Sequence, residues 1–92
     1  DLGIEIHAKP AKSEGASGML LRVGEAYAIA YATHIESPGF RRFSISHELG
    51  HYLLPGHVEA VLDTTGVHES FAGFRSDNVY EKEADSFAAG LL

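Results

Sequence analysis

The sequence predicts a small α+β domain in which a short antiparallel sheet packs against two helices. Two apolar stretches, residues 19–23 and 26–32, are separated only by a Gly-Glu pair, which is typical of a β-hairpin. Apolar residues then recur at helical spacing over roughly residues 38–54 and again over roughly 78–92. The 92 residues correspond to one domain. Because the chain does not start with Met, we expect these residues to be part of a longer protein.

The N-terminal third is predicted to supply about three strands. Residues 2–8 alternate apolar and polar side chains, which favours a strand with one face in water. Residues 10–18 contain Pro, Gly and Ser and are predicted to form a loop. The other two strands are the arms of the hairpin, and in residues 26–32 the larger side chains alternate with alanines.

The stretch after the hairpin carries the start and stop signals of a helix. Ser37 can cap the first turn, and Pro38 is well tolerated at the first helical position. Pro55 and Gly56 end the pattern. Gly50 costs about 1 kcal/mol relative to Ala inside a helix, so it either allows close packing or is simply tolerated. The apolar positions are Phe43, Ile45, Leu49, Leu53 and Leu54.

Residues 56–79 are harder to interpret. Residues 58–62 could form a short helical piece, and loop-forming residues follow at Gly66, Ser70, Gly73, Ser76 and Asp77. The final helix covers roughly Asn78 to Leu92, and Asp77 or Asn78 can cap it. Its apolar stripe consists of Ala84, Phe87, Ala88 and Leu91.

Composition excludes several classes of function. The formal net charge is −6, so the basic surface that nucleic-acid binding needs is absent, and we expect no direct DNA binding by this chain. Membrane insertion is not expected either, since no apolar run reaches the roughly 18 residues of a membrane span. The chain has no cysteine, which rules out disulfides and thiolate metal ligands and fits a cytoplasmic location.

The centre of the predicted helix carries the pattern His-Glu-x-x-His at residues 47–51. Two histidines four apart lie on the same face of a helix, so His47 and His51 can reach one metal ion. Glu48 lies beside them, close enough to act as the catalytic carboxylate on a water bound to that metal. Zinc binds neutral imidazole readily, and a catalytic zinc needs a third protein ligand with one position left open.

The final helix offers three acids near its start. Glu81 and Asp85 are four apart and share one side of the apolar stripe, whereas Glu83 flanks the other side. Glu81 as the third ligand, with Asp85 accepting the far N–H of a ligating histidine, fits this geometry. The spacing does not exclude Glu83, and all three acids could also be solvated residues near a helix N-terminus.

Two separated blocks of sequence resemble one known family. Residues 41–51 read R-R-F-S-I-S-H-E-L-G-H, and residues 81–92 read E-K-E-A-D-S-F-A-A-G-L-L. They are similar to the R-R-F-[ST]-x-A-H-E-L-G-H and E-x-x-A-[ND]-x-F-A-x-x-L-L blocks of the ImmA/IrrE family of zinc metallopeptidases. With the hairpin, the resemblance covers roughly residues 18–92. Ser46 stands where the family often has Ala, and the chain stops before the usual Met-Pro.

This resemblance implies a zincin-like fold, in which a small antiparallel sheet packs on the helix that carries the active site. It implies His47, His51 and Glu81 as zinc ligands and Glu48 as the catalytic carboxylate, and it favours Glu81 over Glu83. Family members typically cut helix-turn-helix repressors, so Zn²⁺ is the expected cofactor and a repressor of this kind the expected partner. Any DNA-binding domain would lie outside these residues.

Several alternatives stay open at the level of sequence. An extended substrate could add a strand to the sheet edge, and residues 26–32 either offer that edge or lie inside the sheet. The domain could also dock a regulator without cutting it, or hold a structural zinc, although structural sites usually have four protein ligands. Four side chains are either oxyanion donors or packing residues: His57, His68, Tyr52 and Tyr80.

Overall fold

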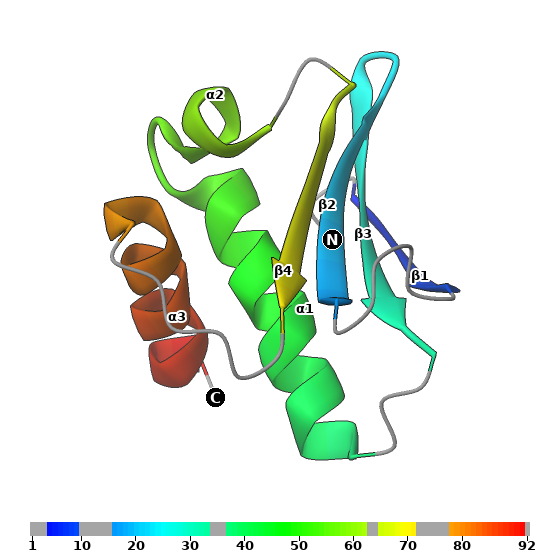
Figure 1. Cartoon of the computed structure of the whole chain (residues 1–92), viewed down its shortest axis with the longest axis vertical. Coiled ribbons are helices and arrows are strands. Elements are labelled where there is room, and N and C mark those ends of the chain that lie inside the picture. Colours follow the sequence, from blue (N-terminus) through cyan, green and yellow to red (C-terminus); the bar gives the residue numbers. More distant parts are fainter. Residues whose placement is uncertain (1–3, 10–15, 34–36, 63–64, 72–77, 92) are drawn as a thin grey trace.

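The computed structural model describes residues 4–9, 16–33, 37–62, 65–71 and 78–91, in which three strands are followed by two helices, a fourth strand and a third helix. In chain order the elements are β1 (Glu5–Lys9), β2 (Ala16–Val23), β3 (Ala26–Ala32), α1 (Pro38–Leu53), α2 (His57–Val61), β4 (Val67–Phe71) and α3 (Val79–Leu91) (Figure 1). The α+β class predicted from the sequence is therefore confirmed.

The strands form one mixed sheet in the order β1-β3-β2-β4. β2 and β3 are the antiparallel arms of the predicted hairpin, and Gly24 in the turn has a left-handed φ of 63°. β4 pairs with β2 in antiparallel, with His68 opposite Leu20, whereas β1 pairs with β3 in parallel. Within the described residues the sheet thus has four strands rather than about three, and it is mixed rather than purely antiparallel.

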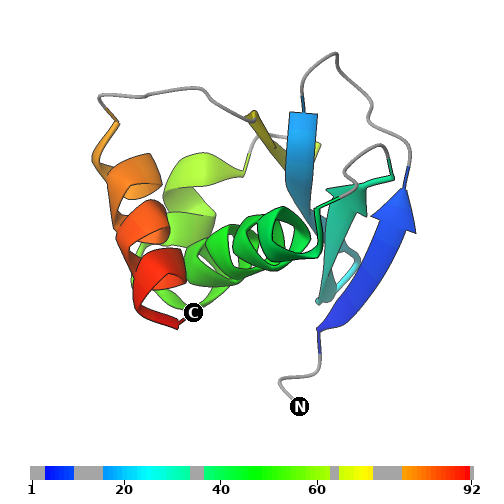
Figure 2. The ribbon, with the colours of Figure 1, turned by 90° about the horizontal axis from the view of Figure 1, so that it is seen from below.

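Helix α1 lies between the sheet and α3. Figure 2 shows α1 crossing one face of the sheet, with α3 on its far side. Leu20 and Ile29 are fully buried in the sheet, and Ala84 and Ala88 are fully buried on α3. The buried residues of α1, in contrast, are polar or glycine: Ser44, Ser46, His47, Glu48, Gly50 and His51. A polar layer thus lies inside the molecule, which requires specific partners for these groups.

Both ends of α1 follow the predicted signals. The Phe40 N–H donates to the Ser37 hydroxyl at 3.2 Å, and Pro38 is the first helical residue. At the other end, the Leu54 N–H donates to the Gly50 carbonyl at 2.8 Å. Gly56 follows with a left-handed φ of 80°, and α2 starts one residue before the short helical piece that the sequence predicts.

Gly50 allows α1 and α3 to pack closely. A Cβ at this position would lie 3.1 Å from Cδ1 of Phe87 and 3.4 Å from Cα of Ala84. The shorter of these distances is below the usual separation of two carbon atoms, so a side chain at residue 50 would displace its neighbour. Of the two interpretations of Gly50, the structure supports close packing.

Strand β2 begins earlier than predicted. Of the predicted loop over residues 10–18, residues 10–15 lie outside the described residues, and Ala16, Ser17 and Gly18 belong to β2. All three are small and buried. A Cβ on Gly18 would lie 3.1 Å from a carboxylate oxygen of Glu48, so the lack of a side chain makes room for α1. A stretch that reads as a flexible turn is here a close helix–sheet contact.

Strand β4 has no counterpart among the predicted strands. It lies in residues 56–79, where Gly66 does form a turn with a left-handed φ of 79°, but Ser70 is in the strand rather than a loop. β3 lies between β1 and β2, so the prediction that residues 26–32 offer a sheet edge is wrong and the internal alternative is confirmed. In the described part of the sheet, the edge strands are β1 and β4.

Candidate metal and catalytic site

Three potential ligand atoms converge at the contact between α1 and α3. His47 and His51 lie one helical turn apart on α1, and their Nε2 atoms are 3.2 Å apart. Oε1 of Glu81, from α3, lies 3.0 Å from Nε2 of His47 and 3.2 Å from Nε2 of His51. The structure therefore brings together the three side chains that the sequence proposes as metal ligands.

The start of α3 positions Glu81. The side chain of Asn78 caps this helix, because its Oδ1 accepts hydrogen bonds from the Tyr80 N–H at 2.8 Å and from the Glu81 N–H at 3.4 Å. Asp77, the other predicted cap, lies outside the described residues. The cap fixes the first turn of α3. The packing of Ala84 against Gly50 sets the position along α1 at which Glu81 meets the two histidines.

Asp85 lies where the sequence places it, one turn beyond Glu81. Its Oδ1 is 2.8 Å from Nδ1 of His47, on the side of the ring opposite to the ligand cluster. When Nε2 of His47 binds a metal ion, Nδ1 carries the ring proton, and this N–H donates a hydrogen bond to the carboxylate of Asp85. The contact thereby fixes both the tautomer and the orientation of the ring.

Glu48 is fully buried beside this cluster. Its carboxylate lies within 4.8 Å of ring nitrogens of His51 and His68, and neither oxygen has a hydrogen-bond partner among the described residues. Burial raises the pKa of Glu48 to about 7, and the charge of His47 and the hydroxyl of Ser70 oppose this shift only in part. Glu48 is therefore a group that can accept and release a proton near neutral pH.

His68 approaches the site from β4. Its Nε2 lies 3.0 Å from Oε2 of Glu81, in an alignment that does not meet hydrogen-bond geometry, and its ring packs edge-on against that of His51. Burial lowers the pKa of His68, but the interaction with Glu81 and the charge of Glu48 outweigh it, so the pKa is raised. This shift widens the pH range over which His68 is protonated and can donate from both ring nitrogens.

Burial and nearby charges act in opposite directions on the three ligand side chains. Burial lowers the pKa of His47, but the hydrogen bond with Glu81 and three nearby carboxylates outweigh it, so the net pKa is raised. For His51 burial prevails and the pKa is lowered. Burial raises the pKa of Glu81, but contacts with three histidines outweigh it and lower the pKa well below its usual range. An ionised Glu81 and a neutral His51 are the forms that bind metal.

Glu83, the alternative third ligand, is directed elsewhere. Its Oε1 lies 2.7 Å from Nε2 of His57, and Nδ1 of His57 lies 3.0 Å from Nδ1 of His51. His57 therefore contacts the far side of a candidate ligand rather than the substrate side. The two tyrosines considered as oxyanion donors make ring contacts, Tyr80 with His57 and Tyr52 with the β3 residue Tyr27.

The donor set fits a divalent transition-metal ion. Two imidazole nitrogens and one carboxylate oxygen are a known ligand set of catalytic zinc, which leaves a fourth position for water or substrate. The buried carboxylate of Glu48 faces this cluster with no hydrogen-bond partner among the described residues, as expected for a group whose partner is a reacting molecule. The arrangement can therefore support metal-assisted hydrolysis.

The described helices show no transmembrane character, since none of them is both long enough and apolar enough to cross a bilayer.

Comparison with known proteins identifies the family. A family model described as the IrrE N-terminal-like domain, Peptidase_M78, matches residues 1–92. A comparison with curated proteins gives no significant match. The family match covers the whole chain, including the strands before residue 18, and agrees with the resemblance found in the two sequence blocks. This chain belongs to the IrrE N-terminal-like family of metallopeptidases.

Proposed function

We propose that this chain is the catalytic domain of a zinc-dependent endopeptidase. The observation that carries this proposal is the convergence of Nε2 of His47, Nε2 of His51 and Oε1 of Glu81 beside the buried carboxylate of Glu48. Membership in a metallopeptidase family supports the same class of reaction.

Glu48 would move the proton in this reaction. Zinc held by His47, His51 and Glu81 would supply Lewis-acid chemistry, because it polarises a carbonyl group and lowers the pKa of coordinated water to about 7. A carboxylate oxygen of Glu48 would accept one proton from the attacking water. Glu48 would then deliver this proton to the amine nitrogen of the leaving peptide. A pKa of about 7 suits both steps, since the group gains and loses its proton easily at neutral pH.

Strand β4 is the part of the sheet on which we propose the substrate lies. It is the edge strand next to the site, and it carries His68, which contacts both Glu81 and His51. An extended peptide that adds a strand beside β4 would pass the metal ligands. His68 would then donate a hydrogen bond to the carbonyl oxygen of the scissile bond as negative charge develops on it.

The proposed substrate is a helix-turn-helix repressor in the cytoplasm. This part of the proposal rests on the resemblance to the ImmA/IrrE family and on the composition of the chain. The formal charge of −6 disfavours direct contact with nucleic acid, so a role in transcription would act through a protein partner. The lack of cysteine is compatible with a reducing compartment.

A cleavage assay with a matched pair of variants tests this function. Zinc-loaded protein is incubated with a candidate repressor, and mass spectrometry identifies the fragments. Glu48→Gln should retain zinc and lose about 10²–10⁴-fold in rate, because the proton acceptor is removed. Glu59→Gln, which changes an exposed acid on α2, should cleave like the wild type.

Two results would contradict the proposal. Cleavage by the zinc-loaded Glu48→Gln variant at the wild-type rate would eliminate Glu48 as the base. Stable binding of the repressor without cleavage, at full zinc occupancy, would support a docking module instead.

A further inference from the structure

A chain of hydrogen-bonding groups extends from His51 to the surface of α3. Nδ1 of His51 lies 3.0 Å from Nδ1 of His57, the first residue of α2, and Nε2 of His57 lies 2.7 Å from Oε1 of Glu83. His57 is fully buried, and the ring of Tyr80 packs edge-on against it with centroids 5.1 Å apart. Neither His57 nor Glu83 belongs to the sequence pattern that identifies the metal ligands.

Metal binding would fix which group donates and which accepts in each hydrogen bond of the series His51–His57–Glu83. When Nε2 of His51 coordinates a metal ion, the ring proton resides on Nδ1. Nδ1–H of His51 then donates to Nδ1 of His57, which must be the unprotonated nitrogen of that ring. The proton of His57 therefore lies on Nε2, and this N–H donates a hydrogen bond to the carboxylate of Glu83. All the ring nitrogens involved are satisfied, and the chain ends on a negative charge.

We propose that His57 and Glu83 are positioning residues that hold His51 in the tautomer and orientation required for metal binding. The proposal rests on the metal-binding function inferred above. His47 is held by one carboxylate, Asp85, at its Nδ1. His51 has an imidazole in the corresponding place, because the turn at Pro55 and Gly56 brings α2 against the last turn of α1.

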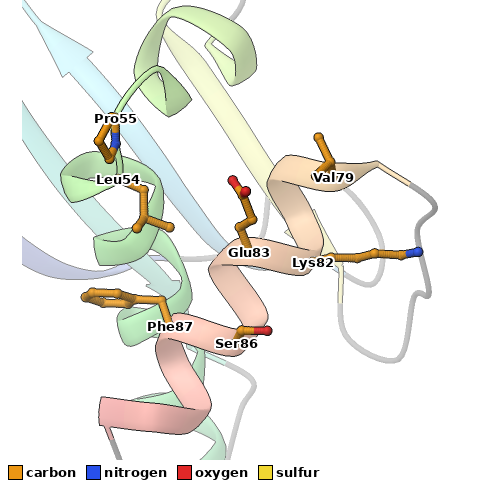
Figure 3. Close-up of a pocket in the computed structure, with 7 residues that line it drawn as sticks. All are labelled: Leu54, Pro55, Val79, Lys82, Glu83, Ser86 and Phe87. Atoms are coloured by element: carbon orange, nitrogen blue, oxygen red, sulfur yellow. The ribbon is translucent and has the colours of Figure 1, made fainter.

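Glu83, at the outer end of this hydrogen-bonded series, is exposed and can be substituted without disturbing buried residues. Figure 3 shows the side chain of Glu83 extending from α3, with Leu54 on one side and Val79 on the other. These residues line a shallow surface pocket between the end of α1 and the start of α3. The side chain of Glu83 is 56% exposed whereas that of His57 is fully buried, so removal of Glu83 leaves the core intact.

The test measures metal binding rather than peptide cleavage. The zinc dissociation constant is obtained by competition with a chromophoric chelator, and the visible absorption of the Co²⁺-substituted protein reports the geometry of the site. The variants are His57→Phe, which keeps an aromatic ring but has neither nitrogen, His57→Asn, whose Oδ1 replaces Nδ1 as acceptor, and Glu83→Ala. Glu59→Ala is the control, since it removes an exposed acid of α2 that is not part of the His51–His57–Glu83 series.

His57→Phe should weaken zinc binding by about 10–100-fold, as is typical when an outer partner of a metal ligand is lost, and should change the Co²⁺ spectrum. His57→Asn should recover most of the affinity, because it restores the acceptor for His51. Glu83→Ala should lose less, up to about tenfold, because solvent can partly replace an exposed carboxylate. Glu59→Ala should match the wild type in both measurements.

Wild-type affinity and an unchanged Co²⁺ spectrum in both His57→Phe and Glu83→Ala would overturn the proposal. If His57→Phe does not fold, as judged by circular dichroism, Glu83→Ala decides: wild-type zinc affinity and an unchanged Co²⁺ spectrum in that variant would overturn the proposal. A wild-type protein that binds zinc but cleaves nothing would contradict the peptidase function while leaving this inference intact. A wild-type protein that binds neither metal would overturn both.

Discussion

The ionisable side chains of the site are each held by a contact on the side away from the ligand cluster, with one exception. Asp85 contacts Nδ1 of His47, His57 contacts Nδ1 of His51, and His68 contacts the second oxygen of Glu81. Such contacts fix ring tautomers and orientations before a metal ion arrives. The exception is Glu48, whose oxygens have no hydrogen-bond partner among the described residues.

The burial of Glu48 should make the metal-free protein less stable at neutral pH than at mildly acidic pH. The pKa of Glu48 is about 7 in the folded state and about 4.5 in an unfolded chain, so between these values the folded state binds more protons. Its contribution to stability therefore falls as pH rises through this window. Glu48→Gln, which stays neutral, should exceed the wild type by roughly 3 kcal/mol above pH 7, and the gap should close near pH 4.5.

Urea denaturation with a chelator present, repeated from pH 4.5 to above pH 7, measures this difference. A gap between the two proteins that does not change with pH, or a less stable Glu48→Gln variant at neutral pH, would show that Glu48 is not buried as an ionisable group with a raised pKa.

Local spacing explains which site residues could be predicted. His47, Glu48 and His51 lie within two turns of one helix, so their relative positions follow from helix geometry alone. Glu81 is brought to them by the packing of α3 on α1, which spacing does not determine, and only the family resemblance favoured it over Glu83. The contact of His57 with His51 depends on the turn after α1, and turn conformations are difficult to derive from a single sequence.

The contact between α1 and α3 determines whether the ligands meet. Helix α1 supplies two of them and α3 the third, and the two helices approach closely at Gly50 because it lacks a side chain. Phe87 and Ala84 of α3 occupy the space that a Cβ would take. Close packing of helices thus has a direct effect on the geometry of the site.

Gly50→Val should separate the two helices. The larger side chain overpacks this contact, which should cost about 1–3 kcal/mol of stability and weaken zinc binding because Glu81 moves with α3. Gly90→Val is the matched control, since a Cβ at Gly90 would point into open space rather than against another element. Denaturant titration and zinc competition measure the two effects. Equal zinc affinities for the two variants would show that this packing does not set the position of Glu81.

The elements themselves were predictable where their signals are local. The cap at Ser37, the stop after α1, the hairpin turn at Gly24 and the cap at Asn78 all lie next to the element that they define. Strand β4 was not predicted because Glu69 stands between the apolar residues Val67 and Phe71, so apolar alternation is weak. The parallel pairing of β1 with β3 is a contact between distant parts of the chain, and no local pattern specifies it.

The whole molecule has a small apolar core and a buried polar layer. Among the described residues, the largest fully buried side chains are Leu20, Ile29 and three ionisable residues of the site, His51, His57 and Glu48. A small domain of this kind often depends on a metal ion for part of its stability. Because the candidate ligands come from α1 and α3, a bound ion would link the helix that covers the sheet to the helix packed on its far side.

Removal of zinc should therefore lower the melting temperature of the whole domain. At a free zinc concentration of about 100 times Kd, binding adds about 2.7 kcal/mol, which corresponds to about 10 °C or more for a domain of this size. Thermal unfolding followed by circular dichroism, with zinc and with a chelator, measures the shift. Glu81→Gln should reduce it strongly. An equal shift in the wild type and in Glu81→Gln would place the stabilising metal elsewhere.

The most direct measurement is the anomalous X-ray scattering of zinc in crystals of the zinc-loaded protein. One strong peak is expected, bonded to Nε2 of His47, Nε2 of His51 and an oxygen of Glu81 at about 2.0–2.2 Å from each, with Glu48 beside it but not bound. A peak at other residues, or a fully zinc-exposed crystal with no peak between α1 and α3, would contradict the assignment of His47, His51 and Glu81 as zinc ligands.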